Sequence, residues 1–347
     1  MTQRLMIKPF IAAAVAALSL VCAAANAEIP FASIPPLARL ERLTAHNEAG
    51  DRLDIVVGKS ADRKPVLAFL PGSVCIPTMD LIDMGAQVGL STTSPLIEAP
   101  VQDALGVHIA LLERRNLVSL QAKIPAAKSD ASVRLAEQPC TERHGGVTLQ
   151  HRVEDSLAQL ALLRQQPWAG PLLLVGTSEG ADVVAAIAAD RRNPAQAILL
   201  IGGAGTSQFF DFVHQQREAK SAVGVRKIFG DLDRFLSGDA PSPYLGYDAA
   251  RWKSFAIDSS PLEHLLRSEI PVFIAHGERD QSVPIASSDT MVIELMRKQP
   301  QRAIFYWSVA DADHGLQRQD GSRYDEVIGA FVRWAMSDPR GRTFRND

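Results

Sequence analysis

A five-residue stretch, Gly-Thr-Ser-Glu-Gly at 176–180, constrains the fold of this chain more than any other. An apolar run precedes it and a run of small and aliphatic residues follows at 181–189, so the sequence predicts a strand, a sharp turn and a helix. Glycine at both ends lets neighbouring backbone pass close by, while the turn holds Ser178 in a strained conformation. The Ser178 hydroxyl is then expected above the sheet, at the N-terminus of a helix. An ordinary Gly/Ser turn is the alternative, and residues elsewhere decide between the two.

Short apolar runs alternate with helical patterns along most of the chain. Strands are predicted at residues 38–43, 53–57, 65–70, 106–112, 171–175, 195–201, 270–275 and 303–309, and helices at 152–164, 181–189, 285–297 and 324–335. The first two runs are expected to form an antiparallel edge. The alternation of the rest indicates an α/β fold with a mainly parallel sheet and helices on both faces. Ligands of such sheets bind beyond the carboxyl ends of the strands, where Ser178 is expected.

Residues 206–262 interrupt this alternation. The segment begins with three phenylalanines, Phe209, Phe210 and Phe212, continues with mixed charge and contains a Gly/Pro/Ser-rich stretch at 237–247. We interpret it as an inserted cap rather than a second domain. The phenylalanines either line an acyl pocket or pack the cap onto the body of the protein.

The N-terminal residues 1–27 have the three parts of an export signal. Two basic residues, Arg4 and Lys8, precede an apolar core at 10–21, and the small residues at 25–27 form a cleavage site. The core is shorter than the roughly 20 residues that a membrane-spanning helix needs. We therefore expect a periplasmic or secreted mature chain, residues 28–347, with no membrane span. A retained N-terminal anchor, or a lipoprotein processed at Cys22, is the alternative.

The net charge bears on possible partners of the chain, and the cysteine content bears on disulfide bonds and metal sites. Removal of the N-terminal segment changes the formal net charge from −3 to −5, and no basic cluster stands out, so nucleic acid is not expected as a partner. Cys75 and Cys140 remain in the mature chain, and two cysteines in an exported protein favour one disulfide. Two separate buried thiols are the alternative. No His or Cys spacing indicates a metal site.

Two loops that follow predicted strands supply the partners that a serine nucleophile needs. Asp280 lies in the loop after residues 270–275, and His314 lies in the loop after residues 303–309. An imidazole can take the proton of a serine hydroxyl near neutral pH. A carboxylate fixes the tautomer of that imidazole and stabilises its charged form. These roles fit Ser178, His314 and Asp280.

The oxyanion formed by attack of a serine needs preorganised donors, usually two backbone N–H groups. The loop Pro-Gly-Ser-Val-Cys at 71–75 follows a predicted strand and can aim N–H groups at an anion. We expect the donors to be the N–H groups of Ser73 and Glu179. A plain Pro-Gly turn is the alternative for this loop.

Several residues have competing interpretations. Asp280 could instead be a solvated turn residue, and the rival carboxylates are Glu278, Asp311 and Asp313, of which the last two lie very near His314 in sequence. His276 and His108 are expected to be structural. The Glu179 side chain either binds a substrate amine or is a first-turn carboxylate favoured by the helix dipole. Cys75 is a conceivable nucleophile, but no nearby base favours that role.

Taken together, these elements give the chain a resemblance to the α/β-hydrolase family across most of residues 38–336. The resemblance rests on the stretch at 176–180, on Gly-x-x-Asp-x-x-Val-Pro at 277–284 and on Asp-His-Gly at 313–315, in that order. It implies a catalytic triad of Ser178, His314 and Asp280, a largely parallel eight-stranded sheet and a lid formed by the cap segment. The oxyanion loop departs from the family pattern, because it reads Leu-Pro-Gly-Ser where many members have His-Gly.

The resemblance implies a serine hydrolase acting on a small-molecule ester or amide, with carboxylic esters as the expected substrates and an acyl-serine intermediate on Ser178. The N-terminal residues 1–27 add the expectation that this hydrolase is exported. It implies no cofactor and no metal. A serine peptidase of the same fold and a non-catalytic binding scaffold are the alternatives. The sequence indicates neither the substrate nor the oligomeric state.

If the export interpretation is correct, mature protein recovered from the periplasm begins at Glu28. N-terminal sequencing together with intact-mass measurement checks this expectation. Recovery of protein that retains Met1, or that carries a lipid on Cys22, would contradict it.

Overall fold

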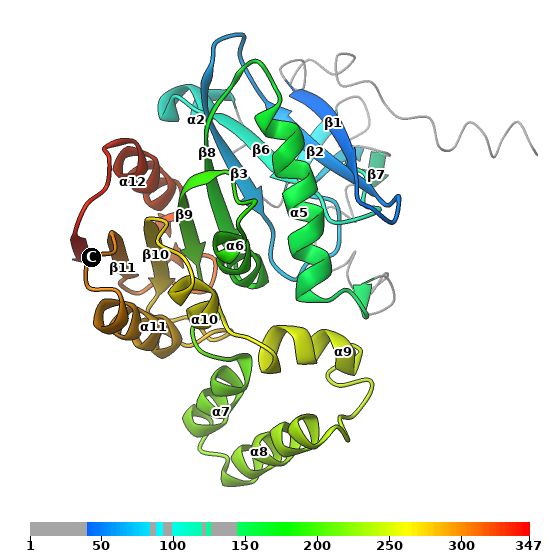
Figure 1. Ribbon diagram of the computed structural model, residues 1–347, viewed down its shortest axis with the longest axis vertical. Helices are drawn as coiled ribbons and strands as arrows, with labels where there is room; N and C mark the ends of the chain where they lie inside the picture. Colours follow the sequence, from blue (N-terminus) through cyan, green and yellow to red (C-terminus); the bar gives the residue numbers. More distant parts are fainter. Residues whose placement is uncertain (1–39, 84–87, 93–98, 120–122, 126–143) are drawn as a thin grey trace, which may run out of the picture.

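The computed structural model describes residues 40–83, 88–92, 99–119, 123–125 and 144–347 (Figure 1). The expected α/β fold is confirmed, with a mixed and mostly parallel main sheet covered by helices. Two expected features, the export signal at 1–27 and Cys140, lie outside the described residues and stay predictions.

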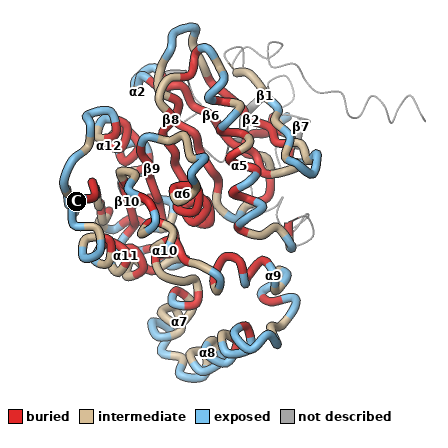
Figure 2. Tube along the Cα trace, in the orientation of Figure 1, coloured by how far each residue is buried: buried red, intermediate tan, exposed pale blue. Residues whose placement is uncertain are grey.

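The main sheet contains nine strands, in the order β1-β2-β6-β3-β8-β9-β10-β11-β14. Their bounds are β1 Leu40–His46, β2 Arg52–Gly58, β3 Lys64–Leu70, β6 His108–Leu112, β8 Ala169–Thr177, β9 Ala195–Ile201, β10 Val272–Gly277, β11 Ile304–Val309 and β14 Arg342–Asn346. The pairs β1–β2 and β2–β6 are antiparallel, and every later pair is parallel. The central strands are buried on both faces, which is why each reads as a continuous apolar run (Figure 2).

Two hydrophobic clusters cover the two faces of this sheet. On one face the strands pack against α5 Leu149–Arg164, α6 Glu179–Ala189, α10 Pro261–Leu266 and α11 Ile285–Lys298. On the other face they pack against α12 Tyr324–Met336, with Leu105 of α2 Ala99–Leu105 beside it. Helices on both faces leave the ends of the strands as the open places where a site can form.

The sequence analysis expects eight strands in the main sheet, and the ninth is β14. This strand pairs in parallel with β11 at the edge of the sheet, where the Arg345 guanidinium carbon lies 3.6 Å from the centre of the Trp307 ring. An edge strand is partly exposed and therefore needs no apolar run, so its sequence, Arg-Thr-Phe-Arg-Asn, gives no strand signal.

Two small sheets are also absent from the prediction. One has the order β5-β4-β7, with β4 Met79–Asp83, β5 Val88–Thr92 and β7 Lys123–Pro125. The other is the pair β12 Gln317–Arg318 and β13 Gly321–Ser322. Their strands are five residues long or shorter, which is too short for a periodic pattern to be recognised.

The segment between β9 and β10 contains α7 Gln208–Glu218, α8 Ala222–Ser237, α9 Ala249–Trp252, the π-helical turn η5 Lys253–Ile257 and α10. Helices α7, α8 and α9 stand together at one end of the molecule, away from the sheet, and α8 is largely exposed (Figures 1 and 2). They have an aromatic core of their own, in which Phe209 is buried against Phe235 and Tyr244. We call α7 to η5 the cap.

The three phenylalanines of the cap have different surroundings. Phe209 packs inside the cap core, Phe212 is half-buried and lines the cavity at Ser178, and Phe210 is 37% exposed. One phenylalanine therefore faces the cavity, and another holds the cap together.

Candidate active site

Ser178 forms the turn between β8 and α6 and has φ +52° and ψ −128°. A positive φ is strained for a residue other than glycine and occurs where the surrounding structure enforces it. The backbone N–H of Ser178 donates to Ile201 O at 2.8 Å, which fixes the turn to the end of β9. The sharp strand-to-helix turn therefore holds Ser178 at the carboxyl end of β8.

Both glycines of the turn are required by close backbone contacts. A Cβ placed on Gly176 would lie 2.2 Å from the carbonyl oxygen of Gly180, and a Cβ on Gly180 would lie 2.3 Å from that of Leu70. Any larger residue would push α6 away from β3 or away from β8. The glycines thus keep the first turn of α6 against the end of β3.

Asp280 and His314 are brought together from the loops after β10 and β11. His314 Nδ1 lies 2.7 Å from Asp280 Oδ2, and the other carboxylate oxygen accepts the backbone N–H groups of Ser282 and Val283 at 2.8 and 2.9 Å. The Asp280 side chain is fully buried, whereas 31% of the His314 side chain is exposed. Asp280 is therefore not a solvated turn residue.

Ser178 and His314 lie against the same short segment at the end of β9. Ser178 bonds to Ile201 O, and Gly202, the next residue, has no side chain at the place where His314 approaches. A Cβ on Gly202 would lie 3.2 Å from His314 Nδ1 and 3.4 Å from Asp280 Oδ2. The end of β9 thus gathers the three residues that the sequence analysis selected.

The rival carboxylates have other partners. Asp311 pairs with Arg279 at 2.5 Å, Asp313 Oδ1 accepts the N–H groups of Gly315 and Gln317, and Glu278 accepts the Ser308 hydroxyl. Among the described hydrogen bonds and ion pairs, Asp280 is the carboxylate that contacts His314.

His276 is a buried histidine of β10, and it also contacts Asp280. Its Nδ1 lies 2.7 Å from the Ser288 hydroxyl, and its Nε2 lies 2.9 Å from Val283 O and 3.2 Å from Asp280 Oδ2. Burial alone would raise the pKa of Asp280, but hydrogen bonds from His276 and His314 outweigh it and hold that pKa well below its usual value. Asp280 is therefore an anion wherever the protein is folded near neutral pH.

A cavity of about 210 Å³ opens beside Ser178. The body of the protein contributes Ser73, Asp182, Ser282 and Val283, and the cap contributes Gln208, Asp211, Phe212, Tyr247, Arg251 and Trp252. Gly72 packs on the serine, because a Cβ there would lie 3.1 Å from Ser178 Cβ. The loop that carries Ser73 is thus beside Ser178, as the oxyanion prediction requires.

Sequence reasoning missed two buried carboxyl groups in this cavity. Asp182 accepts hydrogen bonds from Ala204 N–H and the Gln208 amide, and Asp211 accepts one from the Ser287 hydroxyl. Burial raises the pKa of Asp182 well above its usual value and that of Asp211 to about 7. Asp182 lies in α6 and Asp211 lies in α7 of the cap, and neither position belongs to a sequence motif.

The Glu179 side chain has partners that the sequence analysis did not foresee. It is 7% exposed and pairs with three arginines from three separate parts of the chain. Oε1 lies 2.9 Å from Arg114 Nη2 and 2.6 Å from Arg152 Nη1, while Oε2 accepts from Arg251 of the cap. We call these four residues the Glu179 cluster.

The Glu179 cluster stabilises the charged form of Glu179 but destabilises the charged form of Arg152. Burial would raise the pKa of Glu179, but Arg114, Arg251 and Arg152 together lower it to about 2. In contrast, burial and repulsion by Arg114 lower the pKa of Arg152 to about 9. One carboxylate thus cannot compensate three buried guanidinium groups, and the cluster holds an excess of positive charge next to Ser178.

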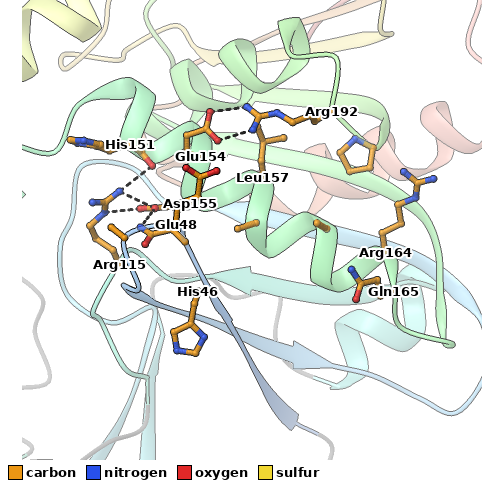
Figure 3. A pocket seen from close by; sticks show the side chains of 15 residues that line it. His46, Glu48, Arg115, His151, Glu154, Asp155, Leu157, Arg164, Gln165 and Arg192 are labelled. Atoms are coloured by element: carbon orange, nitrogen blue, oxygen red, sulfur yellow. Dashed lines mark hydrogen bonds and ion pairs between the residues drawn. The ribbon is translucent and has the colours of Figure 1, made fainter.

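A larger cavity of about 780 Å³ lies elsewhere, along α5 and the β1–β2 turn (Figure 3). Two arginines that line it already pair with carboxylates, Arg115 with Asp155 and Arg192 with Glu154. None of the residues that the sequence analysis selected lines it, so the smaller cavity at Ser178 is the candidate active site.

Cys75 is buried and disulfide-bonded, which excludes it as a nucleophile. Cys140 lies outside the described residues, so the pairing of these two cysteines stays a prediction. Within the described ranges, no group of three or more His, Cys, Asp or Glu residues could hold a metal ion. Nor does any described helix have the length and apolar character needed to cross a membrane.

The Glu179 cluster predicts a specific response to acid. Because the pKa of Glu179 is about 2 in the folded protein and 4.5 ordinarily, its stabilising contribution is complete above pH 4.5 and is lost as the pH falls toward 2. From about pH 5 to about pH 3, the free energy of unfolding of the wild type should fall by about 2 kcal/mol more than that of Glu179→Gln. Urea unfolding at the two pH values measures this difference.

Glu154→Gln is the matched control, because Glu154 also pairs with an arginine but its side chain is 56% exposed. Solvent screens that pair, so the control should follow the wild type closely. Equal acid sensitivity of wild type and Glu179→Gln would show that Glu179 is not the group that titrates.

No protein-family model matches this sequence, and no curated protein matches it either. Solved structures do resemble it. An esterase of Pyrococcus furiosus matches with a TM-score of 0.53 at 11% identity, over 86% of this chain and 91% of the esterase. The 2,6-dihydroxy-pseudo-oxynicotine hydrolase matches with a TM-score of 0.53 at 15% identity, over 90% of this chain and 73% of that one. The acylaminoacyl peptidase of Pyrococcus horikoshii matches with a TM-score of 0.53 at 16% identity, over 87% of this chain and 42% of that one. This protein therefore has the fold of the α/β-hydrolases, which esterases and peptidases share.

Proposed function

We propose that this protein is an exported serine hydrolase that cleaves carboxylic esters through an acyl-serine intermediate on Ser178. The observation that carries the proposal is the hydrogen bond between His314 and the buried Asp280, placed at the segment of β9 that also holds Ser178. Export rests on the sequence of residues 1–27 alone.

The first half of the reaction forms the acyl-enzyme. His314 Nδ1–H donates to Asp280, so Nε2 is free to take the proton of the Ser178 hydroxyl. Ser178 Oγ bonds to the ester carbonyl carbon, and the carbonyl oxygen becomes an oxyanion bound by the N–H groups of Ser73 and Glu179. Collapse of this intermediate breaks the bond to the alcohol oxygen, which receives the proton from His314.

The second half releases the acid. His314 takes a proton from a water molecule, and the water oxygen attacks the acyl carbon. The second tetrahedral intermediate collapses, the bond to Ser178 Oγ breaks, and His314 returns the proton to the serine. Hydrolysis thus consumes one water and leaves the enzyme unchanged.

The cavity favours a small group on one side of the ester. Its volume of about 210 Å³ is below the roughly 300–1,000 Å³ of typical ligand pockets. Phe212, Tyr247 and Trp252 give part of its wall an aromatic surface. A short acyl chain therefore fits better than a long one.

The key test is Ser178→Ala. Loss of the nucleophile should lower turnover of a p-nitrophenyl ester by about 10⁴-fold or more and abolish labelling by a fluorophosphonate probe. Circular dichroism checks that the variant is folded. Ser237→Ala, at the exposed end of α8, is the matched control and should keep full activity. A folded Ser178→Ala protein with wild-type turnover would end the proposal.

A serine peptidase of the same fold is the second candidate. The observation that favours it is Asp211, a buried carboxyl in the cavity that could receive the amino group of a substrate. An alanyl and an isobutyryl ester of one alcohol separate the two, because an ammonium group in one replaces a methyl group in the other. The ester hydrolase should cleave both with comparable kcat/KM. A peptidase should prefer the alanyl ester and cleave alanyl amides, and Asp211→Asn should remove that preference.

A further inference from the structure

Two arginines of the Glu179 cluster also bind the loop that carries Ser73. Arg114 Nη2 donates to Gly72 O at 2.5 Å as well as to Glu179 Oε1. Arg152 Nη2 donates to Pro71 O at 3.1 Å, while its Nη1 bonds to Glu179 Oε1 at 2.6 Å. Each guanidinium therefore joins the backbone of this loop to the side chain of Glu179, which is distant in sequence.

The contact between Arg114 and Gly72 O constrains the direction of one specific N–H group. Gly72 C=O and Ser73 N–H belong to the same peptide unit, which is planar and trans, so they point in opposite directions. Holding Gly72 O in place therefore aims Ser73 N–H. Glu179 carries the other candidate donor on its own backbone, and its side chain is the common partner of both arginines.

The third arginine brings in the cap. Arg251 of α9 donates to Glu179 Oε2, and its guanidinium carbon lies 4.2 Å from the centre of the Tyr247 ring and 4.9 Å from that of Phe255. Arg251 and Tyr247 both line the cavity at Ser178. The cap thus holds the same carboxylate as the two arginines of the body.

We propose that Arg114 and Arg152 are positioning residues that hold the N–H groups of Ser73 and Glu179 on the reaction oxyanion, and that Arg251 makes this positioning depend on the seated cap. The inference rests on the proposed function. It adds to it three residues that touch no reacting atom but fix the two groups that do.

Stability alone gives no reason for this arrangement. One arginine is enough to neutralise Glu179, and the side chains of all three arginines are no more than 6% exposed. Buried ion networks can often be replaced by apolar residues without loss of stability. What Arg114 and Arg152 add is a bridge between two oxygens. Arg152 uses its two terminal nitrogens, at the set spacing of a planar guanidinium, and Arg114 makes both bonds from Nη2.

Lysine substitution tests this geometry without removing the charge. A lysine ammonium is a point charge on a flexible stem. It has no second nitrogen to replace the pair that Arg152 uses, and its side chain is one atom shorter than the path to Arg114 Nη2, so it does not reach both oxygens there. In Arg114→Lys and Arg152→Lys, kcat for a p-nitrophenyl ester should fall by about 10²-fold with KM little changed. The binding of a trifluoromethyl ketone, which forms an oxyanion on the serine, should weaken by a similar factor. Rates are normalised to the sites that a fluorophosphonate probe labels.

Arg251→Lys extends the test to the cap. It should also lower kcat, and it should raise the rate at which proteases cut the cap, because the cap loses its bond to Glu179. Arg192→Lys is the matched control, since Arg192 bridges Glu154 and Asp190 on the surface with a side chain 57% exposed. Its kcat should equal that of the wild type.

The possible results separate the two proposals. Wild-type protein that neither hydrolyses esters nor takes label on Ser178 would end the proposed function. An active wild type, together with folded and fully labelled Arg114→Lys and Arg152→Lys variants whose kcat stays within about threefold, would overturn the positioning role alone. If the lysine variants do not fold, Glu179→Gln keeps the shape of the side chain and should show the same loss of kcat at constant KM. Unchanged kcat in that variant would overturn the role equally.

Discussion

The first turn of α6 lies directly on the carbonyl oxygens at the end of β3, and the rest of the site depends on that contact. Because Gly180 has no side chain, the helix can start against Leu70 O, and Ser178 can take its positive φ between the two elements. The same contact brings the loop after β3 beside the serine, so that Gly72 packs on Ser178. The position of the loop, the start of the helix and the strain at the serine are thus consequences of one close approach between backbones.

The parts of this fold that the sequence predicted are those whose burial leaves a pattern. Strands such as β3, β8 and β9 are covered on both faces and read as apolar runs, and Asp280 and His314 follow such runs directly. The edge strand β14 and the short strands of the small sheets leave no such pattern, because they are partly exposed or too short. The main sheet was therefore predicted one strand short.

The Glu179 cluster could not be found from sequence for a different reason. Its arginines lie 65, 27 and 72 residues from Glu179, in a loop, a helix and the cap. Arginine is ordinarily a surface residue, so none of the three stands out. Only the fold brings them to one carboxylate. The cap is joined to the body partly in the same manner, by polar bonds such as Ser287 to Asp211 and Gln208 to Asp182. Phe255 of η5 packs into the core of the body, while other apolar residues of the cap pack among themselves.

The bond from Arg114 to Gly72 O has an electronic consequence as well as a geometric one. A cation on the carbonyl oxygen draws electron density through the conjugated amide and leaves the Ser73 nitrogen with a more acidic proton. Other hydrogen-bond chains show the same effect, with each bond strengthened by about 10–30%. Arg114 does not line the cavity, yet its charge is transmitted into the cavity through three covalently bonded atoms. The peptide group thus lets the buried guanidinium of Arg114 influence the reaction oxyanion without contacting the substrate.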